Sequence, residues 1–194
     1  MIERIRLILF RPYQAWAVIK DERTGFADVL THYLMLLVAI PAFCGMFGYA
    51  FVGMRFGFRA VVYKVPLHMA FVWAVVFYFA TLIGIYVEGI TINTLAPSFH
   101  AKQHAVDAFK LAAYAYTPAA IAGVLKLFPP LSFLGFLISL YSIYLLYCGL
   151  PVMMEAPQEK VVVYLVLIVV VMIVVYLLIG AIPAAILSAA WRPS

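Results

Sequence analysis

Apolar residues run along this chain in long uncharged blocks, and the last block is the longest. Residues 161–191 contain no Asp, Glu, Lys or Arg. A helix needs about 20 such residues to cross a bilayer. The pattern therefore predicts an integral membrane protein, in which lipid replaces water around most of the surface.

Four more uncharged blocks precede the last one, with charged residues gathered between them. They are Tyr33–Met54, Val65–Val87, Leu111–Leu125 and Leu127–Met154. The third block is short, but Lys110 and Lys126 flank it, and long Lys side chains can extend to lipid headgroups. A double proline cannot continue a helix, so Pro129 and Pro130 separate the third helix from the fourth.

These blocks predict an all-α fold, an integral membrane bundle of five transmembrane helices. The predicted spans are residues 31–54, 66–90, 107–127, 131–153 and 161–187. The loops between the blocks are too short to hold a second domain, so one membrane domain is expected over residues 29–192.

Residues 1–28 show a different pattern, in which apolar and charged residues alternate. Ile5, Leu7 and Ile8 are interleaved with Arg4 and Arg6. Such a segment can form an amphipathic helix in the headgroup plane. Two interpretations are open: an anchor or partner-docking helix at the membrane surface, and a helix that packs beneath the bundle.

The composition supports a membrane protein and argues against nucleic acid as a partner. The chain is 68% hydrophobic and 11% charged, more apolar than a soluble domain of this length. Its net charge is +5, but Lys and Arg are spread along the loops, so the charge is better explained by topology. The expected partner is the lipid bilayer itself.

The distribution of Lys and Arg predicts the orientation. With the N-terminus inside, eight Lys and Arg residues lie on the cytoplasmic side and five on the other, where Arg59 and Arg192 are included. Positive residues favour the cytoplasmic side. We therefore expect a protein of the cell (inner or plasma) membrane with a cytoplasmic N-terminus and an external C-terminus.

Several polar residues interrupt the apolar spans. Glu88 lies at the end of the predicted second span, where it indicates either a proton or cation path or an interfacial, paired carboxylate. The other candidates lie in the third and fourth spans: Tyr114, Tyr116, Thr117, Pro118, Tyr141, Tyr144 and Tyr147. Buried hydroxyls need partners, so the tyrosines predict either a seam that joins the two helices or the lining of a ligand groove or conduction path.

Metal binding and catalysis have little support. On one continuous helix His100, His104 and Asp107 would share a face, and imidazole suits zinc. A polar loop explains them equally well, and an H-E-x-x-H pattern is absent, so neither a metal nor a cofactor is expected. No nucleophile with a paired base, phosphate-cradling loop or carboxylate pair can be assembled, and the chain is predicted not to be an enzyme.

Three stretches resemble a known family. They are Arg11–Glu22; Tyr114–Pro118, similar to a G-Y-x-x-x-P motif with Ala113 in place of glycine; and Tyr141–Pro151, followed by Pro157, Lys160 and Tyr164. On these residues the chain resembles the Yip family of multi-pass membrane proteins, specifically its bacterial inner-membrane branch. The resemblance implies five spans and a cytoplasmic N-terminus.

The family is named in eukaryotes for interaction with Ypt/Rab small GTPases. This chain lacks the D-L-Y-G-P motif of the eukaryotic members, and its N-terminal region is much shorter. Both departures argue against a Rab-type GTPase partner.

Two functional hypotheses follow from these patterns. The first is a non-enzymatic scaffold, adaptor or accessory subunit, as a homo-oligomer or within a larger membrane protein complex. The alternative is a small channel or transporter, with a polar path lined by Glu88 and the tyrosines of the third and fourth spans.

Overall fold

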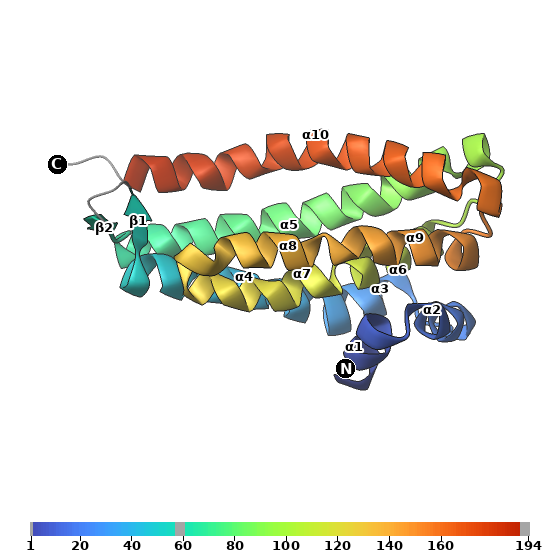
Figure 1. Cartoon of the computed structure of the whole chain (residues 1–194), viewed down its shortest axis with the longest axis horizontal. Helices are drawn as coiled ribbons and strands as arrows, with labels where there is room; N and C mark the ends of the chain where they lie inside the picture. Colours follow the sequence, from blue (N-terminus) through green and yellow to red (C-terminus); the bar gives the residue numbers. More distant parts are fainter. Residues whose placement is uncertain (1, 57–60, 191–194) are drawn as a thin grey trace.

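Five long helical segments run along the bundle in the computed structural model, which describes residues 2–56 and 61–190 (Figure 1). All five are long and apolar enough to cross a membrane: Phe26–Val52, Leu67–Phe99, Ala105–Leu127, Pro129–Met153 and Gln158–Ala189. The predicted all-α, five-span fold is confirmed. Arg59 and Arg192, which contribute to the predicted orientation, and Trp191, which ends the last apolar block, lie outside the described residues.

Four of the spans combine several helical segments. The first contains α3 (Phe26–Val29), a π-helical turn (Leu30–Leu34), α4 (Met35–Phe47) and a second π-helical turn (Gly48–Val52). The second is α5 (Leu67–Leu95) with a 3₁₀ turn (Ala96–Phe99). The third contains α6 (Ala105–Ala115), α7 (Thr117–Ala122) and a 3₁₀ turn (Gly123–Leu127). The fourth contains a 3₁₀ turn (Pro129–Leu131), α8 (Ser132–Ser139) and α9 (Tyr141–Met153).

The fifth span is the single long helix α10 (Gln158–Ala190). Two short helices precede the bundle, α1 (Ile2–Phe10) and α2 (Pro12–Asp21). A feature that the sequence patterns did not predict follows the first span, where β1 (Met54–Phe56) pairs with β2 (Val61–Tyr63) in a small antiparallel sheet.

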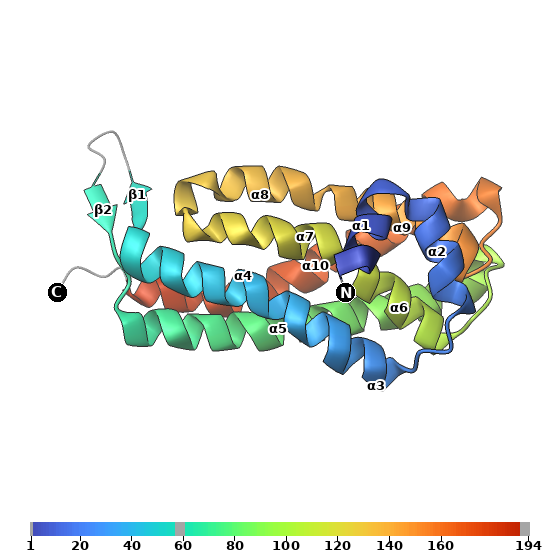
Figure 2. The same cartoon turned by 90° about the horizontal axis from the view of Figure 1, so that it is seen from below.

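The helices are arranged so that the loops gather at two ends. Helix α5 contacts α4, α6 and α10, while the third and fourth spans pair through α6 with α9 and α7 with α8. Helices α1 and α2 lie beside α9 at one end, and the β1–β2 hairpin lies near the end of α10 at the other (Figures 1 and 2). Helices α1 and α2 therefore lie toward one end of the bundle and the last residues of α10 lie at the opposite end, as five crossings require.

The second span extends further than the sequence predicted. The prediction ended it at residue 90, whereas α5 continues to Leu95. Tertiary packing explains the extension, because Ile92 is fully buried and Gly89 lies against the backbone of Phe109 in α6. The hydroxyl of Thr91 donates a 2.9 Å hydrogen bond to the carbonyl of Val87. Glu88 consequently lies about two helical turns before the end of α5 rather than at the end of the span.

The lysines expected to flank the third span do not extend to headgroups. Lys110 is 3% exposed and lies inside α6. The Nζ atom of Lys126 lies 3.7 Å from the ring centroid of Phe77 and 5.7 Å from that of Trp73. Aromatic faces attract a cation when it is shielded from water. Contacts inside the bundle therefore hold both ammonium groups.

The N-terminal helices pack on the bundle through one face. Ala15, Trp16 and Ile19 of α2 are buried, as is Ile8 of α1. The outer face remains open, and Phe10 at the end of α1 is 78% exposed. The buried face matches the interpretation of a segment that packs beneath the bundle.

Replacing Gly149 with Ala should loosen the contact between α2 and α9. A Cβ atom at residue 149 would lie 2.8 Å from Cε2 of Trp16 and closer still to Leu111. Overpacking of this kind costs about 1–3 kcal/mol. We expect Gly149→Ala to lower the melting temperature in detergent, measured by circular dichroism.

Gly180→Ala is the matched control, because no heavy atom lies within 4 Å of a Cβ built there. Alanine is the better helix former by about 1 kcal/mol, so this variant should melt at or slightly above the wild-type temperature. Equal melting temperatures for the two variants would contradict the packing argument.

Candidate functional site

Polar side chains gather in two places, at the end of the bundle that carries α1 and α2 and in a groove along its side. We call the first the end cluster, formed by Arg4, Lys20, Glu22, Lys110, Tyr114 and Glu155. We call the second the Glu88 groove.

Arg4 connects α1 to two other parts of the chain. Its guanidinium donates hydrogen bonds of 2.5 and 2.7 Å to both carboxylate oxygens of Glu22. It also donates to the hydroxyl of Tyr114, and its Cζ atom lies 5.3 Å from that ring's centroid. Both contacts to Glu22 come from the Nη2 atom, and hydrogen bonds between charged groups are stronger than those between neutral ones. Arg4 therefore joins α1, the segment after α2 and α6.

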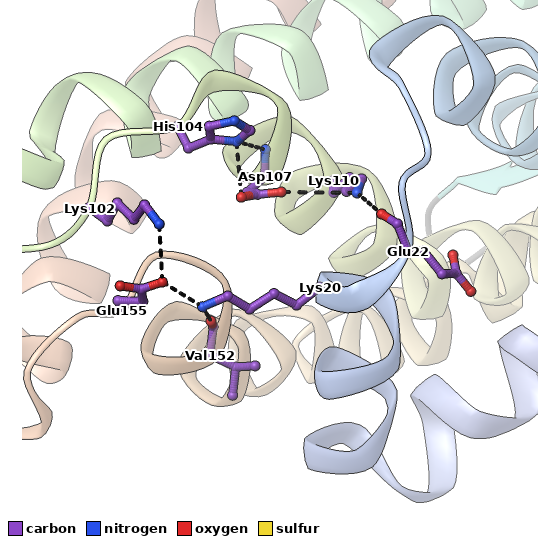
Figure 3. Close-up of polar contacts among 8 residues, drawn as sticks. All are labelled: Lys20, Glu22, Lys102, His104, Asp107, Lys110, Val152 and Glu155. Atoms are coloured by element: carbon purple, nitrogen blue, oxygen red, sulfur yellow. Dashed lines mark hydrogen bonds and ion pairs between the residues drawn. The ribbon is translucent and has the colours of Figure 1, made fainter.

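Lys20 makes a second connection, between α2 and the loop before α10. Its Nζ atom donates to the carbonyl of Val152 at 2.7 Å and to Oε1 of Glu155 at 2.8 Å (Figure 3). Lys102 approaches the same carboxylate oxygen at 3.4 Å. The hydrogen bond and charge of Lys20, followed by the charge of Lys102, lower the pKa of the Glu155 carboxyl. The Glu155 carboxylate thus connects α2 to the loop before α10, in which Glu155 lies, and to the loop that contains Lys102.

The third connection uses a buried lysine. Lys110 donates a 2.8 Å hydrogen bond to the backbone carbonyl of Glu22, and its Nζ atom lies 4.0 Å from Oδ1 of Asp107 (Figure 3). A buried charge is tolerated when it is paired and hydrogen-bonded. Lys110 therefore holds the segment after α2 against α6.

The proposed metal ligands serve other purposes. Helix α6 begins only at Ala105, so His100, His104 and Asp107 do not lie on one helix. His104 caps α6 by accepting the backbone N–H of Asp107 at 3.3 Å, and its Nδ1 atom lies 2.9 Å from the Asp107 carboxylate. His100 lies 2.7 Å from Nζ of Lys160. Within residues 2–56 and 61–190, His, Cys, Asp and Glu form no group of three that could hold a metal ion.

The tyrosines of the third span point to different neighbours. Tyr114 faces Arg4, and its ring packs on that of Tyr33 at a centroid distance of 4.5 Å. The hydroxyls of Tyr33 and Thr117 are 2.8 Å apart, and Thr117 donates to the carbonyl of Tyr114 at 2.6 Å. Tyr116 instead lines the Glu88 groove. Pro118 lies in the first turn of α7, where the missing N–H costs least.

The tyrosines of the fourth span are also divided. The hydroxyl of Tyr141 donates a 2.9 Å hydrogen bond to the carbonyl of Leu9 and so connects α9 to α1. The ring of Tyr144 packs against that of Tyr141, but its side chain is exposed, and Tyr147 is half-buried. The structure therefore brings only Glu88 and Tyr116 of the predicted path into one groove.

The Glu88 groove is a cavity of about 460 Å³ between α5, α7, the fourth span and α10. Its apolar lining includes Leu146, Ile168 and Met172, and its polar lining consists of Glu88, Tyr116, Ser139, Ser142 and Tyr176. The hydroxyl of Tyr176 lies 3.4 Å from Oε2 of Glu88. The hydroxyl oxygen of Ser142 is buried and has no hydrogen-bond partner.

Sequence reasoning missed three of these polar residues, which are Ser139, Ser142 and Tyr176. Tyr176 lies inside the longest apolar block, and Ser142 lies between the tyrosines of the fourth span. The sequence signal that could have indicated a close neighbour here is Gly84, which lies one turn before Glu88 on the same face of α5. A Cβ atom at residue 84 would lie 2.6 Å from Cε1 of Tyr176, so glycine leaves the space that this ring occupies.

Comparisons with known proteins confirm the family resemblance. A family model described as the Yip1 domain matches residues 6–180. Two strains of Escherichia coli, K12 and O6:H1, contain an inner membrane protein YohC that is 28% identical to this chain over 152 residues, 77% of each protein. No solved structure matches the chain.

Arg4→Met should destabilise the end cluster. The change leaves the half-buried Glu22 carboxylate and the buried Tyr114 hydroxyl without their shared donor, and an unpaired buried hydroxyl costs about 1–3 kcal/mol. We expect a lower melting temperature in detergent. Arg6→Met is the matched control because Arg6 is exposed on the same helix. An unchanged melting temperature for Arg4→Met would show that the cluster contributes nothing to stability.

Glu155→Gln should remove a pH-dependent part of the stability. The pKa of Glu155 is lower in the folded chain, so its carboxylate stabilises the fold above the ordinary pKa of a glutamate. This contribution is lost as the pH falls through the lowered pKa. We expect Glu155→Gln to melt below wild type at pH 7, with the difference disappearing at acidic pH and in about 1 M salt.

The control is Glu159→Gln, which removes an exposed acid nearby in α10. Its melting temperature should follow that of wild type across the titration. A difference between Glu155→Gln and wild type that persists at acidic pH would assign the effect to something other than the ion pair.

Proposed function

Because the chain belongs to the Yip1-domain family, we propose that it is a non-enzymatic scaffold or accessory subunit of the inner membrane. The E. coli relative is named as an inner membrane protein, which supports this location. The excess of Lys and Arg on the N-terminal side supports a cytoplasmic end cluster.

The observation that carries the proposal is the attachment of α1 and α2 to the bundle. Contacts from Arg4, Lys20 and the carbonyl of Leu9 reach the third span, the fourth span and the loop before α10. The two amphipathic helices and the membrane domain therefore behave as one unit. A rigid surface beside the membrane is what an adaptor needs to present to another protein.

The outer side of this unit offers a surface for such a contact. Phe10, Tyr13 and Val18 are exposed there, together with Arg6 and Arg11. Aromatic residues and arginines are enriched at protein interfaces. The assignment of Tyr114, Thr117 and Tyr141 to internal hydrogen bonds also favours a structural role for them over a conduction path.

Site-specific photocrosslinking in native membranes tests the proposal. A photoreactive residue in place of Val18, on the outer side of α2, should form a protein adduct of defined mass. The same residue in place of Leu177 should react mainly with lipid, because Leu177 is exposed in the middle of α10. An adduct of twice the chain mass would identify a homo-oligomer, and any other discrete mass would identify an accessory subunit.

A strictly monomeric chain in mild detergent, without any protein adduct at residue 18, would contradict the scaffold. Solute flux into liposomes that exceeds the flux into empty vesicles, and that Glu88→Gln abolishes, would favour the transporter instead.

A further inference from the structure

The carboxyl group of Glu88 lacks a partner of opposite charge. Among the described residues no ion pair involves it, and its nearest polar contact is the 3.4 Å approach of the Tyr176 hydroxyl. Ionisable groups inside a membrane are costly and normally face a partner or a functional site. Glu88 therefore has the position of a ligand-binding acid.

The Cα–Cβ bond of Glu88 is directed away from the nearer end of α5. Glu88 lies seven residues before the end of α5 at Leu95, or about 10 Å along the helix axis. A helical Cα–Cβ bond tilts toward the helix N-terminus, and the N-terminus of α5 lies at the opposite end of the bundle (Figure 1). The Cα–Cβ bond of Glu88 thus tilts along α5 toward the middle of the bundle.

The groove around Glu88 has the size of a small-molecule site. Its volume of about 460 Å³ falls within the range of ligand pockets, about 300–1,000 Å³. Mostly apolar side chains line it, including Leu146 and Met172. An apolar chain can occupy such a space, and lipid-facing α8 and α10 border it.

The polar groups of the groove favour a cation with N–H donors. Glu88 supplies negative charge, and the hydroxyl of Ser142, buried without a partner, can accept a further hydrogen bond. Tyr116 and Tyr176 also line the groove, and aromatic rings can attract a desolvated cation. An anion would be repelled by the carboxylate, and a simple hydrocarbon would leave these polar groups unpaired.

The geometry points to the Glu88 groove as a binding site for a lipophilic primary amine that enters from the bilayer. The ammonium group binds beside Glu88 and the tyrosine rings, and the apolar chain lies along α10. This site is independent of the scaffold proposal, because none of its residues belongs to the end cluster.

The test uses the full chain in nanodiscs of phosphatidylcholine and two fluorescent probes. One is a dansyl-labelled long-chain primary amine, and the other is the corresponding alcohol. Wild type should bind the amine saturably and at least about tenfold more tightly than the alcohol, because a charge-assisted hydrogen bond contributes more than a neutral one. Equal affinities for the two probes would overturn the proposal.

Two variants distinguish the effect of the charge on Glu88 from the effect of the space in the groove. Glu88→Gln keeps the shape and removes the charge, so it should weaken amine binding at least about tenfold and leave alcohol binding unchanged. Ala119→Phe keeps the charge and fills the groove from α7, so it should weaken both probes. Circular dichroism and gel filtration verify that each variant is folded.

Glu159→Gln, which removes an exposed acid of α10 outside the groove, should bind the amine like wild type. Full amine affinity in folded Glu88→Gln would overturn the assignment. If Glu88→Gln does not fold, the Ala119→Phe variant tests the proposal instead. Amine binding by Ala119→Phe that equals wild-type binding would exclude the groove as the site.

A final arm identifies the source of the amine. Phosphatidylethanolamine added to the nanodiscs displaces the probe if the natural occupant is a lipid amine. Absence of displacement, with binding that still depends on Glu88, assigns the site to a free lipophilic amine.

Discussion

Every polar group that this chain carries into the bilayer must find a partner within the chain, because hydrocarbon offers none. This constraint explains most of the polar contacts inside the bundle. The hydroxyl of Tyr164 in α10 donates to the backbone carbonyl of Ile92 in α5, and the hydroxyls of Tyr33 and Thr117 meet across two spans. These contacts add directional bonds to an otherwise apolar packing, and they fix which faces of the helices meet.

The same constraint explains where the spans are broken. The third span changes direction around Tyr116, between α6 and α7, where Thr117 donates its hydroxyl to a carbonyl freed by the break and Pro118 needs no acceptor. Glu88 and Ser142 are among the exceptions, since one has a single long contact and the other has none. These two lie in the same groove, whereas the Oδ1 atom of Asn93 in α5, which is also buried without a partner, lies outside it.

The uncharged blocks were sufficient to predict the five spans, because four of them are long enough to cross a bilayer and the third, Leu111–Leu125, lies between two of these. The blocks could not place the end of α5, since Gly89 and Ile92 extend that helix through packing on α6, which is not visible along the sequence. The positions of the tyrosines in the third and fourth spans indicated polar contacts, but they did not indicate which neighbours the hydroxyl groups contact. Tyr114 and Tyr116 are two residues apart and face opposite neighbours, Arg4 and the Glu88 groove. Long-range contacts of this kind depend on the fold as a whole.

The end cluster also has a consequence for biogenesis. Arg4 finds its partner Tyr114 after 110 residues, and Lys20 finds Glu155 after 135. A chain is synthesised from its N-terminus, so α1 and α2 leave the ribosome long before the surfaces that receive them exist. During that interval their apolar faces have only the membrane surface or a chaperone to cover them. Helices α1 and α2 are thus made before the membrane spans and reach their final positions after them.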